Sequence, residues 1–385
     1  VGCGQKSSGK PKVCRSLLAI QTYGASPGKT QQSEIPPAWP CSKYKLYKLI
    51  KCKAITSDIQ RRELWKMKAL IIYYSQTGNT QKAARKIRDG LKAEGWETKV
   101  SLLKYTRAED LEGYDLIGIG TPVWYEMPPN MRLFVESLPD QNGKLVFSFC
   151  THATMPDLYF PLVIPRLKRA GFKVLGWDKW YGNCSIQIFP EPYYTYGHPD
   201  EKDLSDAMDF GSHMGRMAAA VLRGENVKFP EDPKPDMMPM HANAAIEHLG
   251  GFHNVHGRLV RDKEKCLYPK CRICIDNCPM KYNDYGSDPQ KYGNLGDCCD
   301  NRHGCTYCEM LCPVGAIHPE VPYEEAAPVG KDHGSELFCT VLGKAEAEGK
   351  FRRLIPFEKV GTKTPFYSIH SEHPRLKPLS TKEDN

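Results

Sequence analysis

Short apolar runs alternate with amphipathic segments over residues 67–223 of this chain. Five of the runs have the length and composition of strands in a parallel sheet, either buried on both faces or alternating along their length. They are residues 69–74, 97–103, 115–120, 145–150 and 172–182. Between the first two runs, apolar residues at helical spacing form one face of a helix that Gly95 ends. Alternating strands and helices predict right-handed crossovers and an α/β fold with a doubly wound, five-stranded parallel sheet.

A loop rich in hydroxyl groups, the SQTGNT loop (residues 75–80), joins the first run to the first helix. A phosphate at the N-terminus of that helix would meet free backbone N–H groups and the positive end of the helix dipole. No Lys follows the glycine, as it does in nucleoside-triphosphate loops, and the absence of a G-x-G-x-x-G motif counts against a dinucleotide site. The SQTGNT loop therefore predicts a phosphate site of another kind.

The third run ends in the sequence TPVWYEMPPN, which places Trp124 and Tyr125 just beyond a strand end. Their flat faces suit stacking on a planar ring, because ligands of doubly wound sheets bind at the carboxyl ends of the strands. The alternative for Trp124 is ordinary core packing. The fourth run leads into FCTHATMPD, in which His152 either approaches the ligand or faces water, and Cys150 is expected to be buried and inert.

Together these motifs resemble the flavodoxin family over residues 67–223, and the resemblance implies a bound FMN. It implies that the SQTGNT loop binds the FMN phosphate through Ser75, Gln76, Thr77, Gly78, Asn79 and Thr80. It also implies that two further loops flank the isoalloxazine ring, with the residues Thr121, Pro122, Val123, Trp124, Tyr125, Cys150, Thr151 and His152.

Ten of the sixteen cysteines lie in the last third of the chain, mostly at the spacing of metal ligands. The frame C-x2-C-x3-C-P occurs at residues 271–279 and again at residues 305–313. Pairs of the C-x2-C type also suit tetrahedral zinc, so a zinc-held interaction module is the alternative. The repeated Cys-Pro and the sequence CPVGAI resemble two-cluster bacterial ferredoxins, in which the last Cys of each frame ligates the other cluster. This resemblance implies a small α+β ferredoxin-like domain with two [4Fe–4S] clusters.

The ferredoxin resemblance assigns four ligands to each cluster. Cluster one takes Cys266, Cys271, Cys274 and Cys312, and cluster two takes Cys278, Cys299, Cys305 and Cys308. Cys266 stands five positions before Cys271, and Cys299 stands six before Cys305, so each half carries an insertion relative to the usual spacing. Cys298 is the alternative to Cys299.

Positive charge is concentrated near the N-terminus, although the formal net charge of the whole chain is +8. Residues 1–66 hold 13 Lys or Arg against 3 Asp or Glu, whereas the remaining residues hold 40 against 42. This stretch lacks a sustained apolar period, so we expect a disordered basic extension; an arm that binds nucleic acid or an acidic partner is the alternative. Since Met67 opens the first strand, we also expect that the working protein starts there and that the extension is not native.

Four further segments follow the extension. They are a flavodoxin-like domain (67–228), a linker (229–264), the ferredoxin-like domain (265–320) and a tail that packs on the body (321–385). A metal site at His253 and His256 is the alternative to a plain linker. The aromatic loop at residues 189–199 either caps the flavin or forms a surface loop.

Residues 67–385 as a whole resemble the ferredoxin–flavodoxin fusion proteins of anaerobic microbes. The resemblance implies a protein that passes electrons between FMN and the clusters, as a carrier or as the electron-input subunit of a low-potential reductase. Its partners would be redox proteins, a ferredoxin or a reductase complex, rather than nucleic acid. The alternative is an FMN-dependent reductase that acts directly on a quinone or nitro compound, and the sequence leaves carrier and enzyme open. No apolar run reaches about 18 residues, which predicts no membrane span, and clustered cysteines suit the reducing cytoplasm.

Overall fold

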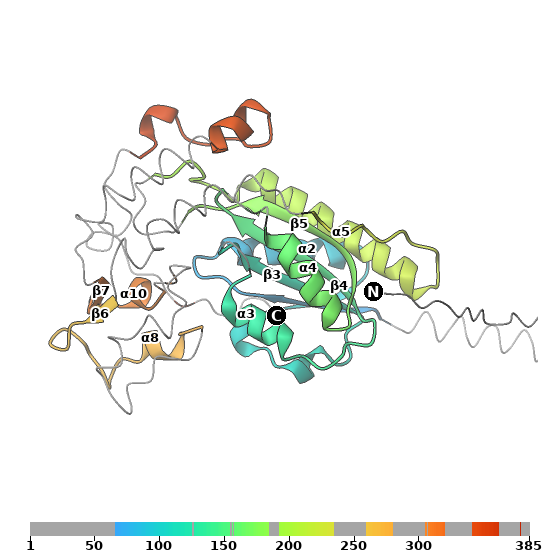
Figure 1. Ribbon diagram of the computed structural model, residues 1–385, viewed down its shortest axis with the longest axis horizontal. Coiled ribbons are helices and arrows are strands. Elements are labelled where there is room, and N and C mark those ends of the chain that lie inside the picture. The colour runs from blue at the N-terminus through green and yellow to red at the C-terminus, as the bar shows by residue number, and fades with distance from the viewer. Residues whose placement is uncertain are drawn as a thin grey trace, which may run out of the picture. The chain divides into compact units, whose positions relative to one another are not determined.

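The computed structural model describes ten segments of the chain (Figure 1). They are residues 66–124, 127–154, 156, 158–184, 192–234, 259–279, 305, 307–319, 341–361 and 378. All of them belong to one compact unit, Leu64–Asn385. The predictions for the basic extension, for Tyr125, for Cys298 and Cys299 and for the linker histidines lie outside the described residues.

Five parallel strands form the central sheet of this unit, in the order β2-β1-β3-β4-β5. Their bounds are β1 Lys68–Tyr73, β2 Glu97–Leu102, β3 Leu116–Pro122, β4 Leu145–His152 and β5 Lys173–Tyr181. Each strand lies on one of the five predicted runs, and the doubly wound parallel sheet predicted from the sequence is confirmed. The one irregularity in pairing is a shift between β4 and β5 at Val146/Phe147.

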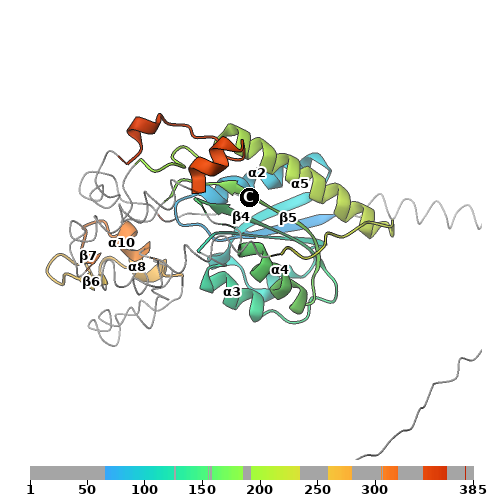
Figure 2. The same ribbon diagram turned by 45° about the horizontal axis from the view of Figure 1, so that its top comes forward.

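Four helices cover the two faces of the sheet (Figure 2). Their bounds are α2 Asn79–Ala93, α3 Pro129–Glu136, α4 Tyr159–Arg169 and α5 Glu201–Leu222. Helices α2 and α5 share one hydrophobic core with the sheet, and α3 and α4 share the other. Successive residues of a strand point to opposite faces. Accordingly Ile71 of β1 packs toward α2 and α5, and its neighbour Ile72 packs toward α3 and α4.

Glycines allow α2 and α5 to cross at very short distance. A Cβ atom at Gly90 of α2 would lie 2.0 Å from the backbone oxygen of Met208. In the same way a Cβ atom at Gly211 of α5 would lie 2.3 Å from the backbone oxygen of Ile87. This close crossing packs α2 against α5 on one face of the sheet, and the SQTGNT loop leads into the N-terminus of α2.

The cysteine-rich part is built from short elements. Strands β6 Leu259–Arg261 and β7 Ile317–Pro319 form an antiparallel pair, and two short helices, α8 Ile273–Asp276 and α10 Tyr307–Leu311, contact each other. Three 3-10 turns are also described, η1 Leu103–Tyr105, η2 Ala108–Leu111 and η5 Phe357–Lys359, and residues 341–347 are helical. Within the described part of the chain, none of the helices combines the length and apolarity that crossing a membrane requires.

Candidate functional site

The SQTGNT loop turns sharply between β1 and α2. Gly78 has a φ of 94°, in the left-handed region that favours glycine, and its N–H donates to the hydroxyl of Ser75 at 3.1 Å. Helix α2 begins at the next residue, Asn79, without a side-chain cap. Backbone N–H groups in the first turn of a helix have no acceptor within the helix, so this turn presents donors to an anion.

Side chains of the SQTGNT loop differ in how accessible they are. Thr77 and Asn79 are half-buried, and the amide of Asn79 donates to the backbone oxygen of Asn183 at 3.1 Å. Thr80 is fully buried, and its hydroxyl shares a hydrogen bond of 2.8 Å with the hydroxyl of Thr151. The backbone of Thr80 therefore remains the part of this residue that is placed to meet a ligand.

The second predicted loop begins at the end of β3. Thr121 is fully buried and shares a hydrogen bond of 2.6 Å with the hydroxyl of Tyr159, and burial raises the pKa of that tyrosine above its usual value. The ring of Trp124 stands edge-on to Tyr74, with centroids 5.8 Å apart and an angle of 82° between the planes. Trp124 is partly buried against the core on the α3 and α4 side. Trp124 therefore lies just beyond the end of β3 and also contacts the hydrophobic core.

The third predicted loop begins at the end of β4. Cys150 is fully buried, and His152 is buried with its ring centroid 4.6 Å from that of Tyr181. Burial lowers the pKa of His152 to about 3, and the positive charges of Lys179 and His198 add to the effect. Its Nδ1 atom is buried and has no hydrogen-bond partner among the described residues. His152 is therefore neutral at physiological pH, with a ring nitrogen left for a ligand or a water molecule.

Cysteines of both frames come together in one buried cluster. Cys274 of the first frame lies with Cys308 and Cys312 of the second, and Cys266 packs against them. Cys274 and Cys312 are assigned to cluster one and Cys308 to cluster two, so this shared contact does not separate the two ligand sets, which stay predictions. No disulfide joins any two of the nine described cysteines.

Several N–H groups point at the cysteine sulfurs. The backbone N–H of Ala316 donates to the Sγ atom of Cys312 at 3.1 Å. Burial raises the pKa of Cys305 to about 12, and the nearby charge of Cys278 contributes to this rise. A hydrogen bond from the backbone of Tyr307 acts in the opposite direction and lowers the pKa. Cys278 and Cys305, both assigned to cluster two, are thus close enough to interact.

Among the described residues, the side chains of Gln76 and Lys104 donate hydrogen bonds from the flavodoxin-like part to the cysteine-rich part. The side-chain amide of Gln76 donates to the backbone oxygen of Cys305 at 2.9 Å and to its Sγ atom at 3.7 Å. The ammonium group of Lys104 donates to the Oδ1 atom of Asn277 at 2.8 Å. No local sequence signal indicates either contact, because each joins residues that lie more than a hundred positions apart.

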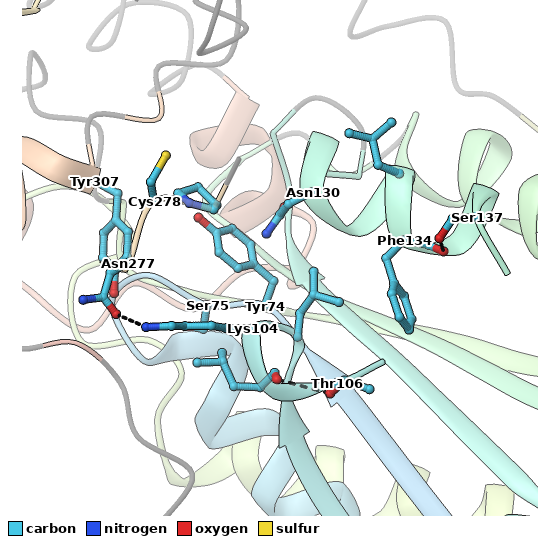
Figure 3. A pocket seen from close by; sticks show the side chains of 14 residues that line it. Tyr74, Ser75, Lys104, Thr106, Asn130, Phe134, Ser137, Asn277, Cys278 and Tyr307 are labelled. Atoms are coloured by element: carbon cyan, nitrogen blue, oxygen red, sulfur yellow. Dashed lines mark hydrogen bonds between the residues drawn. The ribbon is translucent and has the colours of Figure 1, made fainter. Parts of the chain in front are cut away.

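A cavity of about 450 Å³ lies where these parts meet (Figure 3). The residues that give it polar or aromatic character include Tyr74, Ser75, Lys104, Asn130, Cys278 and Tyr307. In Figure 3 the side chain of Lys104 runs along the wall toward Asn277. The Oδ1 atom of Asn130 is buried without a hydrogen-bond partner in the described segments.

Another polar cluster, His198, Asp200 and Asp203, has its potential ligand atoms within 4.8 Å of one another. These atoms already have protein partners. Asp200 caps α5 by accepting from the N–H groups of Lys202 and Asp203, and it accepts two hydrogen bonds from Arg352 at 2.6 and 2.8 Å. His198 bonds Asp203 at 2.5 Å through Nδ1 and the backbone oxygen of Arg352 at 2.8 Å through Nε2. The cluster therefore fastens Arg352 to the start of α5.

Comparisons with known proteins agree with the fold. A family model described as Flavodoxin matches residues 71–186. A flavodoxin from the domain Archaea is 20% identical, with a TM-score of 0.32, over 40% of this chain and 99% of that one. A flavodoxin of Megasphaera elsdenii is 20% identical, with a TM-score of 0.30, over 38% of this chain and 98% of that one. The family model thus agrees with the flavodoxin-like α/β fold of residues 71–186.

Another similarity concerns ferredoxins. An uncharacterized ferredoxin of Methanocaldococcus jannaschii is 32% identical to this chain over 59 residues, which are 15% of this chain and 89% of that protein. Over this match the chain belongs to the ferredoxin family.

Proposed function

We propose that the chain is an electron-transfer protein that carries FMN in its flavodoxin domain and two [4Fe–4S] clusters in its cysteine-rich part. The observation that carries the proposal is the convergence of cysteines from both frames, in the same compact unit as the flavodoxin-like sheet. The proposal thus makes the chain a ferredoxin–flavodoxin fusion, as the motifs and the two separate matches suggest.

The residues at the three strand ends fit FMN. The SQTGNT loop offers backbone N–H groups at a helix N-terminus together with the side chains of Thr77 and Asn79, a donor set that suits a phosphate. His152 keeps a buried ring nitrogen unpaired at the end of β4, beside the Thr151 hydroxyl that bonds Thr80. In this proposal the residues Ser75 to Thr80 hold the phosphate, and the residues Thr121 to Tyr125 and Cys150 to His152 flank the ring.

The cysteines fit iron–sulfur clusters. Thiolates that ligate iron are stabilised by N–H groups directed at sulfur, and Ala316 and Gln76 supply such groups. Burial of Cys274, Cys308 and Cys312 would keep water from the sulfurs. The proposed ligand sets are Cys266, Cys271, Cys274 and Cys312 for cluster one, and Cys278, Cys299, Cys305 and Cys308 for cluster two.

The cofactors would supply the redox chemistry, since FMN exchanges electrons singly or in pairs and each iron–sulfur cluster exchanges one electron at a time. The protein's residues orient the groups, exclude water and adjust potentials through hydrogen bonds. No residue has to act as a general acid or base. We propose redox proteins as donor and acceptor, and the reducing cytoplasm as the compartment that keeps these thiols free.

A second candidate function is direct reduction of a small acceptor. The cavity of about 450 Å³ beside Ser75 favours it, because cavities of this size hold small organic molecules. Turnover of a quinone or nitro compound with NAD(P)H by the purified chain would favour this enzyme over the carrier.

Anaerobic purification followed by quantification of iron, acid-labile sulfide and flavin tests the proposal. We expect about eight iron atoms, as many sulfides and one FMN per chain. Bound zinc without labile sulfide would instead support the zinc-held module, and a preparation without flavin would refute the assignment of the SQTGNT loop.

A further inference from the structure

Gln76 occupies a position between the two proposed cofactor sites. Its backbone is part of the SQTGNT loop, while its side chain turns away and is only 7% exposed. The side-chain amide reaches Cys305 and donates to both the backbone oxygen and the Sγ atom, at 2.9 and 3.7 Å. One side chain thus ties the loop assigned to FMN to a cysteine assigned to cluster two.

Other contacts between the two parts fall on the same side. Lys104, just beyond β2, donates to Asn277, the neighbour of Cys278. The wall of the cavity in Figure 3 also places Ser75 and Cys278 around the same space. Cys278 and Cys305 are both assigned to cluster two. Among the described residues, these contacts of the flavodoxin-like part therefore lie at or beside two cysteines that are assigned to cluster two.

A hydrogen bond to a ligating sulfur has a predictable electronic effect. An N–H group that points at a thiolate stabilises negative charge on the cluster, and the reduced form carries one more negative charge than the oxidised form. Such a bond raises the reduction potential of its cluster. Gln76 donates through an uncharged amide that is buried, so water does not replace the bond readily when it is lost.

We propose that Gln76 is a positioning residue that holds the Cys305 thiolate next to the FMN loop, so that cluster two is the cluster that exchanges electrons with FMN. This inference rests on the proposed function. In that exchange one electron leaves FMN for each electron that cluster two gains, and no bond between them forms or breaks.

Redox titrations of the full chain, monitored by electron paramagnetic resonance under anaerobic conditions, test this inference. The variant Gln76→Leu removes the N–H donor, and Gln76→Glu replaces it with a carboxylate. Cys305→Ser replaces a proposed ligand of cluster two, so the resonance signal that changes in this variant identifies cluster two. We expect the potential of cluster two to become more negative in Gln76→Leu, and more so in Gln76→Glu, while cluster one keeps its potential.

Gln81→Leu is the matched control. Gln81 is also 7% exposed, and its amide donates to the hydroxyl of Tyr73 at 2.8 Å, inside the flavodoxin domain. Both cluster potentials should stay unchanged in this variant. If Gln76→Leu loses iron instead of shifting a potential, loss of about four iron atoms with cluster one retained supports the inference.

Two outcomes would overturn the inference: unchanged cluster potentials in both Gln76 variants, or an equal shift of both clusters. Failure of the proposed function looks different, because the unmodified chain would then lack flavin or labile sulfide before any variant is compared.

Discussion

Replacing Gly90 by alanine should destabilise the flavodoxin domain, although the same change usually stabilises a helix. Alanine is favoured over glycine inside a helix by about 1 kcal/mol. At Gly90, however, the added Cβ atom would lie 2.0 Å from the Met208 oxygen and 2.7 Å from the Ser212 nitrogen, both in the backbone of α5. Backbone atoms cannot rotate aside, so the two helices must separate.

The expected size follows from these two opposing effects. Forcing extra atoms into a packed core costs about 1–3 kcal/mol, and contacts this short with backbone belong at the upper end. After the gain in helix propensity is subtracted, we expect a net loss of about 2 kcal/mol in the free energy of unfolding. For a domain of this size that corresponds to a fall of about 4–8 °C in melting temperature.

Urea denaturation followed by tryptophan fluorescence measures the effect in the full chain. Gly343→Ala is the control, because Gly343 lies in helical backbone where an added Cβ atom meets nothing within 4 Å. The control should be neutral or more stable by up to about 1 kcal/mol. A Gly90→Ala variant as stable as the unmodified chain would refute the reasoning from the α2–α5 crossing.

Three further predictions concern charge and ligation. Arg352→Gln should lower the free energy of unfolding by up to about 1 kcal/mol, the usual limit for an exposed pair. The hydrogen bond from Arg352 holds the pKa of Asp200 well below its usual value, so this difference is fully present above about pH 4 and begins to shrink as the pH falls below that value. Urea denaturation of both proteins from pH 3 to 7 measures it. Burial lowers the pKa of His152 to about 3, so its ring should remain neutral in nuclear magnetic resonance titrations down to about pH 4. Because the same histidine in the unfolded chain takes up a proton near pH 6.5, the free energy of unfolding should fall as the pH drops below that value. A titration midpoint near 6.5 for this ring in the folded chain would contradict its burial. Cys312→Ala should lose cluster one and about half the iron, whereas loss of cluster two alone would contradict the crossed ligation.

The parallel sheet could be predicted because buried strands are encoded locally. The apolar run at residues 69–74 became β1 within one residue at each end, and Gly95 follows the end of α2 with a φ of 83°. Each of these features depends on neighbours in sequence. The strand order β2-β1-β3-β4-β5 came only with the structure, because right-handed connections alone do not fix where the order reverses.

Contacts between distant segments could not be predicted in this way. Gln76 stands in a loop whose composition indicates a phosphate site, and nothing near it indicates a contact with Cys305, 229 positions later. Gly90 likewise looks like an ordinary weak point in a helix until α5 is known to cross it. The predicted ligand sets rest on the spacing of the cysteines and on the resemblance to ferredoxins. The buried cluster brings Cys274, Cys308 and Cys312 together, and the ligation itself stays a prediction.

The most direct test of the account is the rate at which electrons move between FMN and the clusters within one chain. Flash reduction of the flavin in the anaerobically purified chain, followed by absorbance of flavin and clusters, measures it. We expect cluster reduction to follow flavin oxidation with a first-order rate that does not change with protein concentration. A rate that rises in proportion to concentration, or no cluster reduction at all, would contradict the claim that one chain joins the two kinds of centre.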